Sequence, residues 1–456
     1  MGTSHPESSD SMAEQSTDPI GHALPGAPDD CPLSLAQQRR NILLYASIFA
    51  LIYLGAPVLY VGMIQASLLD QLGHSKWVSN VPGSVAMWCT PSAVLIVWLL
   101  PYVRLLKLVV AVGFFISACM AGVVVVALIL PEPRWILPAV ILHGAVLSIT
   151  NSTCTAFLWE ILGRGVSLRS RGYAFALAAG PGAAMAVVGS LGSQWLLQQN
   201  MTLDASANLG PRLNYALLYA AVVPMMLLAT ICATQMIVPL PKREAVREPF
   251  LQGVFGGFYD FITNRLIQLA VIGYLLVYAG YSILSTFTLY TETAVGVDSQ
   301  ELVGYQNALR FGFKVLTGIL LGWLLSRSHP KLPLLATTSL CMAAVVTAIL
   351  APGYWFLLSF GIMGAGELFG LYFPNYVLCC SEAPKMRRNM AFCSLITVPA
   401  GCFPILYGAI IDTLKPWAGD RAAFQVSFVM SLVILTTALI LVWWKLPRWP
   451  SPKRAH

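Results

Sequence analysis

Four ionisable residues stand deep inside otherwise apolar stretches of the chain: His143, Arg310, Lys314 and Glu367. Arg310 and Lys314 are spaced i, i+4, which places both cations on one face of a helix. A guanidinium matches a carboxylate or a phosphate through two parallel hydrogen bonds, so this pair predicts a site for an anion. Glu367 and His143 are groups that take up and release protons, and they are the candidates for proton coupling.

A structural interpretation of the same residues stays open. In this interpretation Glu367 neutralises Lys314 or Arg310 and the three residues form a buried ionic cluster. His143 is then a core histidine bonded to a neighbouring helix. Charge within a membrane is nevertheless a candidate functional site by default, because it is costly to keep there. For the anion site, one acid against two cations leaves a net charge of +1 before the substrate binds.

The surrounding stretches identify the class of protein. The chain has 456 residues, of which 57% are hydrophobic and only 10% charged. Soluble domains carry about 25% charged residues, so an ordinary cytosolic enzyme is excluded. The apolar residues fall in runs of about 20, the length that crosses a bilayer as a helix. The sequence predicts an all-α polytopic membrane protein, and without a nucleotide, metal or nucleophile motif we expect no enzyme activity, cofactor or metal.

Hydropathy predicts twelve transmembrane helices in two six-helix, pseudo-symmetric bundles. The expected spans are about 41–64, 83–103, 108–130, 135–160, 173–197, 213–239, 265–290, 304–326, 333–351, 354–380, 391–413 and 421–445. The expected organisation is a disordered cytoplasmic tail at 1–40, an N-terminal bundle at 41–239, a central cytoplasmic loop at 240–264, a C-terminal bundle at 265–445 and a cytoplasmic tail at 446–456. Phenylalanines in the central loop suggest an amphipathic segment lying on the bilayer surface: Phe250, Phe255, Phe258 and Phe261.

Lys and Arg fix the predicted orientation. With the N-terminus in the cytoplasm, 20 of the 27 Lys and Arg residues fall in inner loops and tails, and five fall outside. Both termini are therefore predicted to be cytoplasmic, in a plasma or bacterial inner membrane. The net charge of +7 follows from this asymmetry, and no basic-aromatic module indicates nucleic-acid binding.

The two halves of the sequence contain an internal repeat. Glu160 precedes Arg171-Gly-Tyr-Ala-Phe, and Glu382 precedes Arg388 and Met-Ala-Phe. Gly180-Pro181-Gly182 in the fifth span corresponds to Pro399-Ala400-Gly401 in the eleventh. Repeated halves are a transporter design in which the substrate site lies at the midplane between them.

On these residues the chain resembles the major facilitator superfamily, over about 41–445. The loop from Gly322 to Lys331 is similar to that family's Gly-x-x-x-Asp-Arg-x-Gly-Arg-Lys loop, with Ser326 at the acidic position and Arg327 after it. The resemblance implies gating roles for five residues: Glu160, Arg171, Arg327, Glu382 and Arg388. Anchoring of helix ends at lipid headgroups explains the same charges equally well.

The resemblance also implies that helices 1, 2, 4, 5, 7, 8, 10 and 11 line a central cavity. All four buried ionisable residues fall on these helices. At 1.5 Å per residue, Lys314 lies roughly 15 Å deep, and Glu367 lies at a similar depth on helix 10 among glycines that let another helix approach. Asn151 lies one face further down helix 4 from His143, and Tyr278 belongs to a tyrosine stripe on helix 7; both are candidate substrate contacts.

These patterns predict a secondary transporter that works by alternating access, moving a small organic anion by symport with protons. Its expected partners are the small molecule, protons and the lipid bilayer, with no nucleic acid. One alternative is a transporter or exporter of a neutral or drug-like solute, in which the charges are structural. Another is an assembly or sensory relative of the fold that transports nothing. The first-half loop at 101–107 favours this alternative, because it keeps little of the family's loop pattern beyond two basic residues.

Overall fold

The computed structural model describes residues 33–100, 102–198, 210–239, 249, 257–381, 389 and 392–450 of the chain. Across these ranges the chain forms helices and no β-strand. Six membrane-length rods make up the N-terminal half: α1 (Leu35–Leu54) with α2 (Ala56–Leu59) and α3 (Met63–Gln71), α4 (Lys76–Cys89) with α5 (Ser92–Leu99), α6 (Leu106–Ile129), α7 (Ile136–Gly165), α8 (Leu168–Gln198) and α9 (Gly210–Thr234).

A short helix, α10 (Gly257–Thr263), precedes the C-terminal half. Six further rods follow it: α11 (Arg265–Tyr281) with α12 (Leu284–Val295), α13 (Ser299–Arg327), α14 (Lys331–Leu350), α15 (Leu358–Gly366) with α16 (Phe369–Cys379), α18 (Thr397–Ala400) with α19 (Cys402–Ala418), and α20 (Asp420–Lys445). The predicted helical class and the division into six and six are confirmed for the described part of the chain.

Nine stretches of the described chain are long and apolar enough to cross a membrane by length and composition. The rods outside those nine are α1, α8 and α13. Two of these, α8 and α13, pack against each other between the two halves.

The boundary of the first rod differs from the expectation. It runs from Leu35 to Gln71 rather than from 41 to 64, so residues 35–40 are helical and not part of a disordered tail. Ser34 accepts a hydrogen bond from the backbone N–H of Gln37, and the Gln37 side chain accepts one from the backbone N–H of Ser34. This reciprocal cap begins the helix six residues before the apolar run does.

The phenylalanines of the central loop are only partly as expected. Phe250 and Phe255 lie outside the described residues. Phe258 is exposed on α10, but Phe261 is buried, and both rings pack against Phe392. The segment is therefore anchored to the C-terminal half through Phe261 and does not lie wholly on a bilayer surface.

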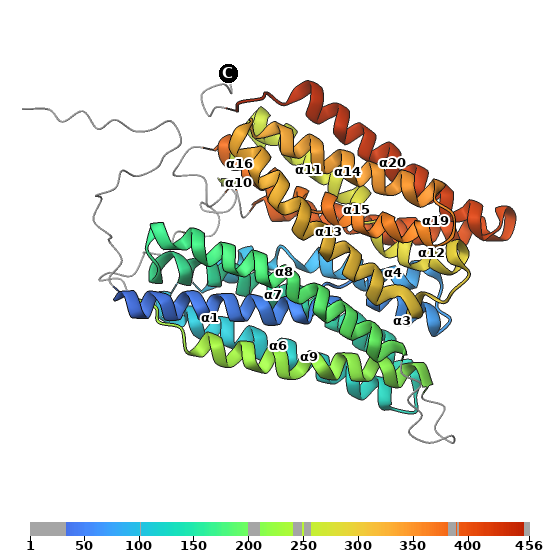
Figure 1. The fold of residues 1–456 in the computed structure, drawn as a ribbon, viewed down its shortest axis with the longest axis horizontal. Coiled ribbons are helices and arrows are strands. Elements are labelled where there is room, and N and C mark those ends of the chain that lie inside the picture. Colours follow the sequence, from blue (N-terminus) through green and yellow to red (C-terminus); the bar gives the residue numbers. More distant parts are fainter. Residues whose placement is uncertain are drawn as a thin grey trace, which may run out of the picture.

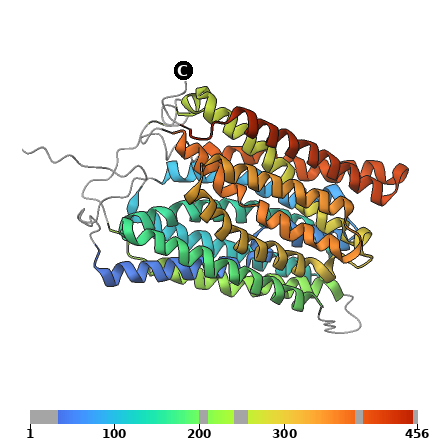
Figure 2. The same ribbon diagram turned by 45° about the horizontal axis from the view of Figure 1, so that its top comes forward.

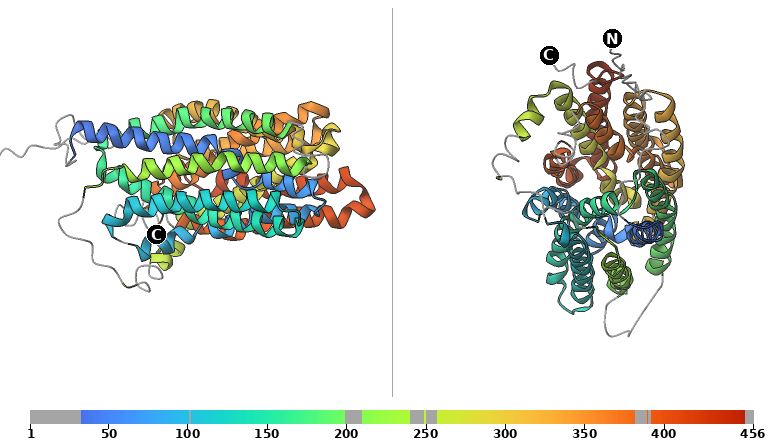
Figure 3. Two further views of the ribbon diagram at one scale, coloured as in Figure 1. Left: turned by 90° about the horizontal axis from the view of Figure 1, so that it is seen from below. Right: turned by 90° about the vertical axis from the view of Figure 1, so that its left-hand side faces the viewer.

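The rods form two bundles that lie side by side, with the N-terminal bundle in blue to green and the C-terminal bundle in yellow to red (Figure 1). The turned views of Figures 2 and 3 show the same arrangement. We call the side where α1 begins and α20 ends the terminal side, and the side where α3 and α12 end the opposite side. The principal contacts between bundles are α8 with α13, α4 with α18 and α19, and α3 and α4 with α12.

Among the described residues, the side-chain hydrogen bonds that join the bundles are concentrated towards the opposite side. There Ser67 bonds Ser299 at 2.9 Å, and Gln71 donates to Asp298 at 3.0 Å. The Gln194 side chain accepts from the backbone N–H of Gly304 at 2.7 Å. Towards the terminal side, the main neighbours of α1 are α7, α8 and α9, and those of α11 are α16, α18 and α20, all within their own bundles.

Candidate functional site

Three charged side chains meet where α13 crosses α15. The Arg310 guanidinium donates through Nε to Glu367 Oε2 at 2.8 Å and through Nη2 to Glu367 Oε1 at 2.9 Å. The Lys314 ammonium lies 3.1 Å from Glu367 Oε1. We call these three residues the ion cluster. Its geometry is the two-pronged pairing of arginine with carboxylate, and its formal charge is +1.

The sequence of each helix explains why the cluster forms. Arg310 and Lys314 stand one turn apart on α13, and Glu367 stands at the junction between α15 and α16. A Cβ at Gly364 would lie 2.1 Å from the backbone oxygen of Arg310, so only glycine permits this approach of α15 to α13. The close approach that the helix-10 glycines predicted is therefore present at Gly364, and it brings the two backbones near enough for the ion pair.

The N-terminal bundle also reaches the cluster. Arg310 Nη1 lies 4.0 Å from the sulfur of Met63, and the Arg310 guanidinium carbon lies 5.9 Å from the centre of the Tyr60 ring. The Phe311 ring lies 5.2 Å from the same guanidinium carbon and meets Tyr60 edge to face. Arg310 thus lies at the boundary between the bundles, with its charge partner in one and an aromatic and a thioether contact in the other.

A break in the first rod presents Tyr60 and Met63. Between α2 and α3 the chain leaves helical geometry, and Gly62 takes a φ of 153°, which favours glycine. The buried Gln65 side chain satisfies the break, since it accepts from the backbone N–H of Gly62 at 2.8 Å and donates to the carbonyl of Val58 at 2.9 Å. Non-helical backbone at membrane depth requires such internal partners.

Tyrosines of α11 form a second wall of the cluster. The hydroxyl of Tyr281 accepts a hydrogen bond from Arg310 Nη2 at 2.8 Å. The Tyr278 ring packs edge to face against Tyr281 and Phe369. Tyr278 was singled out from the sequence as a substrate contact, whereas the structure brings Tyr281 directly to the cluster. Tyr281 stands three residues after Tyr278, so both lie on one face of the helix, and this spacing was the available signal.

Two other candidates lie apart from these contacts. His143 is fully buried in α7 and packs edge to face on Tyr219 of α9, at 5.2 Å between ring centres. Neither ring nitrogen of His143 has a hydrogen-bond partner in the part of the chain that the structure describes. Asn151 is exposed on α7, and the polar contacts of the ion cluster among described residues do not include it.

The predicted gating residues are placed only in part. Glu160 pairs with Arg164, one turn further along α7, at 2.7 Å. The side chain of Arg171 lies outside the described residues, as do Glu382 and Arg388. Arg327 is exposed at the end of α13 on the terminal side. In the described ranges, no three His, Cys, Asp or Glu side chains come together as metal ligands.

No family model matches the sequence, and no curated protein matches it. Solved structures do. A D-xylose–proton symporter has a TM-score of 0.64 at 15% identity, covering 91% of this chain and 99% of its own. The E. coli fucose:proton symporter has a TM-score of 0.60 at 14% identity, covering 90% and 100%. A bacterial homologue of the human lysosomal transporter Spinster, in an inward-facing conformation, has a TM-score of 0.63 at 13% identity, covering 90% and 97%.

These likenesses show that the chain has the fold of major facilitator superfamily transporters, over about 90% of its length. The resemblance noted from the sequence is confirmed at the level of fold. The chain is an integral membrane protein whose rods divide into the two bundles of that fold.

Proposed function

We propose that the chain is a secondary transporter that moves a small organic anion by symport with protons, through alternating access. The observation that carries the proposal is the ion cluster at the boundary between the bundles. It combines two cations and one carboxylate, and the Arg310 and Glu367 side chains are only 7% and 13% exposed. A net positive charge at this depth is costly unless an anion arrives to share it.

The arrangement suggests how a proton and an anion are coupled. Glu367 occupies donors of both Arg310 and Lys314, so an anionic substrate has to compete with Glu367 for the same donors. Protonation of Glu367 removes its charge and leaves both cations for the substrate. Proton and anion then bind together and leave together, which is the requirement for symport.

The remaining candidate residues take secondary places in this proposal. His143 is the alternative proton carrier, although its ring packs on Tyr219. Tyr278 and Asn151 are proposed to contact the substrate. Glu160, Arg171, Arg327, Glu382 and Arg388 are proposed to hold the terminal side when it closes.

The distribution of Lys and Arg supports cytoplasmic termini in a plasma or bacterial inner membrane. In that orientation the opposite side, where the bundles are joined, faces out of the cell. The neighbours' printed descriptions are consistent with transport, since they include proton symporters for fucose and xylose and a nucleoside transporter. Because the described hydrogen bonds between the bundles lie towards the opposite side, we infer that this conformation is open towards the cytoplasm.

The first test is a thermal-unfolding screen of purified protein against organic acids, sugars and nucleosides. A ligand raises the unfolding temperature because it adds RT ln(1 + [L]/Kd) to the stability of the folded state. We expect stabilisation by an organic acid. Counterflow of that acid in proteoliposomes should then fall at least tenfold in Arg310→Gln and Lys314→Gln, with Arg134→Gln, an exposed cation, as the control. Unchanged counterflow in both site variants would reject the anion site.

Glu367→Gln separates coupling from structure. The amide mimics the protonated carboxyl, so exchange of substrate should persist while proton-driven accumulation is lost. If Glu367 only balances the cations, the variant instead leaves two buried positive charges and lowers the unfolding temperature, since stranding a buried charge costs about 3–5 kcal/mol. Full accumulation by a stable variant would remove both roles and leave His143 as the proton candidate.

A neutral solute is the second candidate. Its support is the aromatic wall of Tyr278, Tyr281 and Phe369 beside the cluster, because such a wall suits a sugar or aromatic ring. In that case the ion cluster is already satisfied and is structural. Stabilisation by a sugar or nucleoside, together with transport that survives Lys314→Gln, would favour it.

A further inference from the structure

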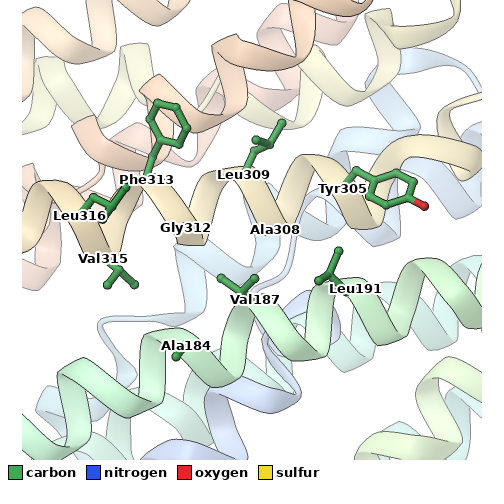
Figure 4. Close-up of a pocket in the computed structure, with 10 residues that line it drawn as sticks. All are labelled: Ala184, Val187, Leu191, Tyr305, Ala308, Leu309, Gly312, Phe313, Val315 and Leu316. Carbon is green, nitrogen blue, oxygen red and sulfur yellow. The ribbon is translucent and has the colours of Figure 1, made fainter.

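An apolar pocket opens between α8 and α13, on the seam between the two bundles. Its volume is about 790 Å³, within the ~300–1,000 Å³ typical of small-molecule sites. Its walls are formed by residues within 184–191 of α8 and 305–316 of α13. In Figure 4, Ala184, Val187 and Leu191 of α8 and Val315 of α13 lie between the two helices, whereas Leu309 and Phe313 project from the side of α13 that faces away from α8.

The pocket is separate from the ion cluster. Val187 packs against a small cluster formed by Ala56, Ala186 and Phe311, and Phe311 is fully buried. The Phe311 ring centre lies 5.2 Å from the Arg310 guanidinium carbon, and the described lining residues of the pocket include no member of the ion cluster. A molecule in the pocket therefore meets hydrocarbon on its walls and does not reach the charged site.

The opening faces the membrane. Leu191, Tyr305 and Leu316 line the pocket and are also exposed, by 46%, 40% and 64%. In a membrane-spanning chain, the medium that covers such residues is lipid. Water is a poor occupant, because a buried water needs two to four polar partners and, among the described lining residues, Tyr305 alone has a polar side chain.

We propose that the pocket binds one acyl chain of a membrane phospholipid. From Tyr305 to Leu316 the wall extends for roughly 16 Å along α13, at 1.5 Å per residue, which suits an extended hydrocarbon chain lying along the seam. Gly312 leaves the space open at its middle, since a Cβ there would meet nothing within 4 Å. The Tyr305 hydroxyl, at the end nearer the opposite side, faces the polar part of the lipid.

The position of the pocket gives the bound chain a conformational role. One wall belongs to each bundle, and the two helices are joined at the opposite side, where Gln194 bonds the backbone of Gly304. On the terminal side of that bond the pocket lies between the two helices. Rocking of the bundles changes the spacing of the two walls, so the acyl chain binds this conformation in preference to the alternative and stabilises it.

The test is photolabelling in phosphatidylcholine vesicles doped with a phosphatidylcholine that carries a diazirine on one acyl chain. We expect labelling to concentrate at residues 184–191 and 305–316, above that of the exposed α20 residues Val426, Val429 and Val433. Gly312→Leu fills the pocket and should reduce labelling of the seam at least fivefold without changing that of α20. Gly122→Leu on α6 is the matched control, because a Cβ at Gly122 also meets nothing within 4 Å.

A second measurement uses delipidated protein in detergent. Added dioleoyl phosphatidylcholine should raise the unfolding temperature of the original chain and of Gly122→Leu more than that of Gly312→Leu. Ala184→Leu fills the pocket from the other wall if Gly312→Leu does not fold. The proposal would be overturned if labelling of the seam were no greater than that of α20. It would also be overturned if Gly312→Leu and Ala184→Leu both left labelling and stabilisation unchanged.

Discussion

Replacing Arg310 would remove all of its contacts at once, so its individual bonds cannot be distinguished in that way. A substitution of Tyr281 tests one of these bonds alone. Replacing Tyr281 by Phe keeps the ring against Phe369 and removes only the hydroxyl that accepts from Arg310. Hydrogen bonds to charged groups contribute about 1.5–3 kcal/mol, so we expect Tyr281→Phe to lower the free energy of unfolding by that order. Chemical denaturation in detergent measures it.

Tyr274→Phe is the control for this prediction. Tyr274 lies on the same helix and, among the described residues, makes ring contacts with Tyr278, Phe369 and Phe373. Removal of its hydroxyl should change stability by less than that of Tyr281. Equal losses in the two variants would show that the bond to Arg310 contributes nothing of its own.

Residue chemistry and depth along each helix placed Glu367 level with Lys314, and a buried ion pair with Lys314 or Arg310 was one of the two interpretations that they left open. They were not enough to predict Tyr60 and Met63, because those contacts depend on how one bundle is placed against the other. The extent of the fourth span is another difference from the expectation. The fourth span was expected to end at 160, but α7 continues to Gly165 and places Arg164 one turn from Glu160.

Among helices, the crossing of α13 and α15 depends on a missing side chain. Gly364→Ala adds a methyl group 2.1 Å from the Arg310 carbonyl oxygen, and neither backbone can yield easily. We expect the two helices to separate and the Arg310–Glu367 bonds to lengthen. The unfolding temperature should fall, and counterflow should fall with it.

Gly370→Ala on α16 is the matched substitution, since a Cβ there would lie 4.0 Å from its nearest neighbour, the Tyr274 hydroxyl. It should leave both quantities near those of the original chain. If the two alanine variants behave alike, the helix crossing tolerates the methyl group and the close approach is incidental.

Helix extents follow from hydropathy where a span is continuous, as in α6 and α20. Hydropathy does not predict the extent of a helix where a backbone break or a capping motif determines where the helix begins or ends. The first rod continues past Gly62 because the Gln65 side chain bonds the backbone on both sides of the break. Hydropathy gives no indication of these bonds. The early start of the rod depends on Ser34 and Gln37, whose capping motif precedes the apolar residues.

At the scale of the whole molecule, we expect the hydrogen bonds that connect the bundles on the opposite side to determine which side opens. We call these bonds together the joint. Asp412 of α19 accepts hydrogen bonds from the backbone N–H groups of Lys76 at 3.1 Å and Trp77 at 2.9 Å, at the start of α4. A carboxylate at a helix N-terminus is also favoured by the helix dipole. Asp412→Ala should therefore weaken the joint and shift the protein towards opening on that side.

Spin labels on cysteines introduced at Leu130 and Tyr354 report the shift, in a background without the exposed Cys119 and Cys402. These positions stand on the opposite side, one in each bundle. Asp412→Ala should broaden the distance distribution towards longer values. Asp420→Ala, which removes a carboxylate that pairs with Lys415 inside one bundle, should not. Identical distributions in both variants would remove Asp412 from the joint.

The bonds of Asp412 have an evolutionary consequence. Its donors are main-chain groups, and every amino acid except proline supplies them at positions 76 and 77. The side chains there are free to drift while the contact persists, so a covariation search between 412 and its partners would find no paired changes. Selection at this joint should appear as a constraint on one position alone.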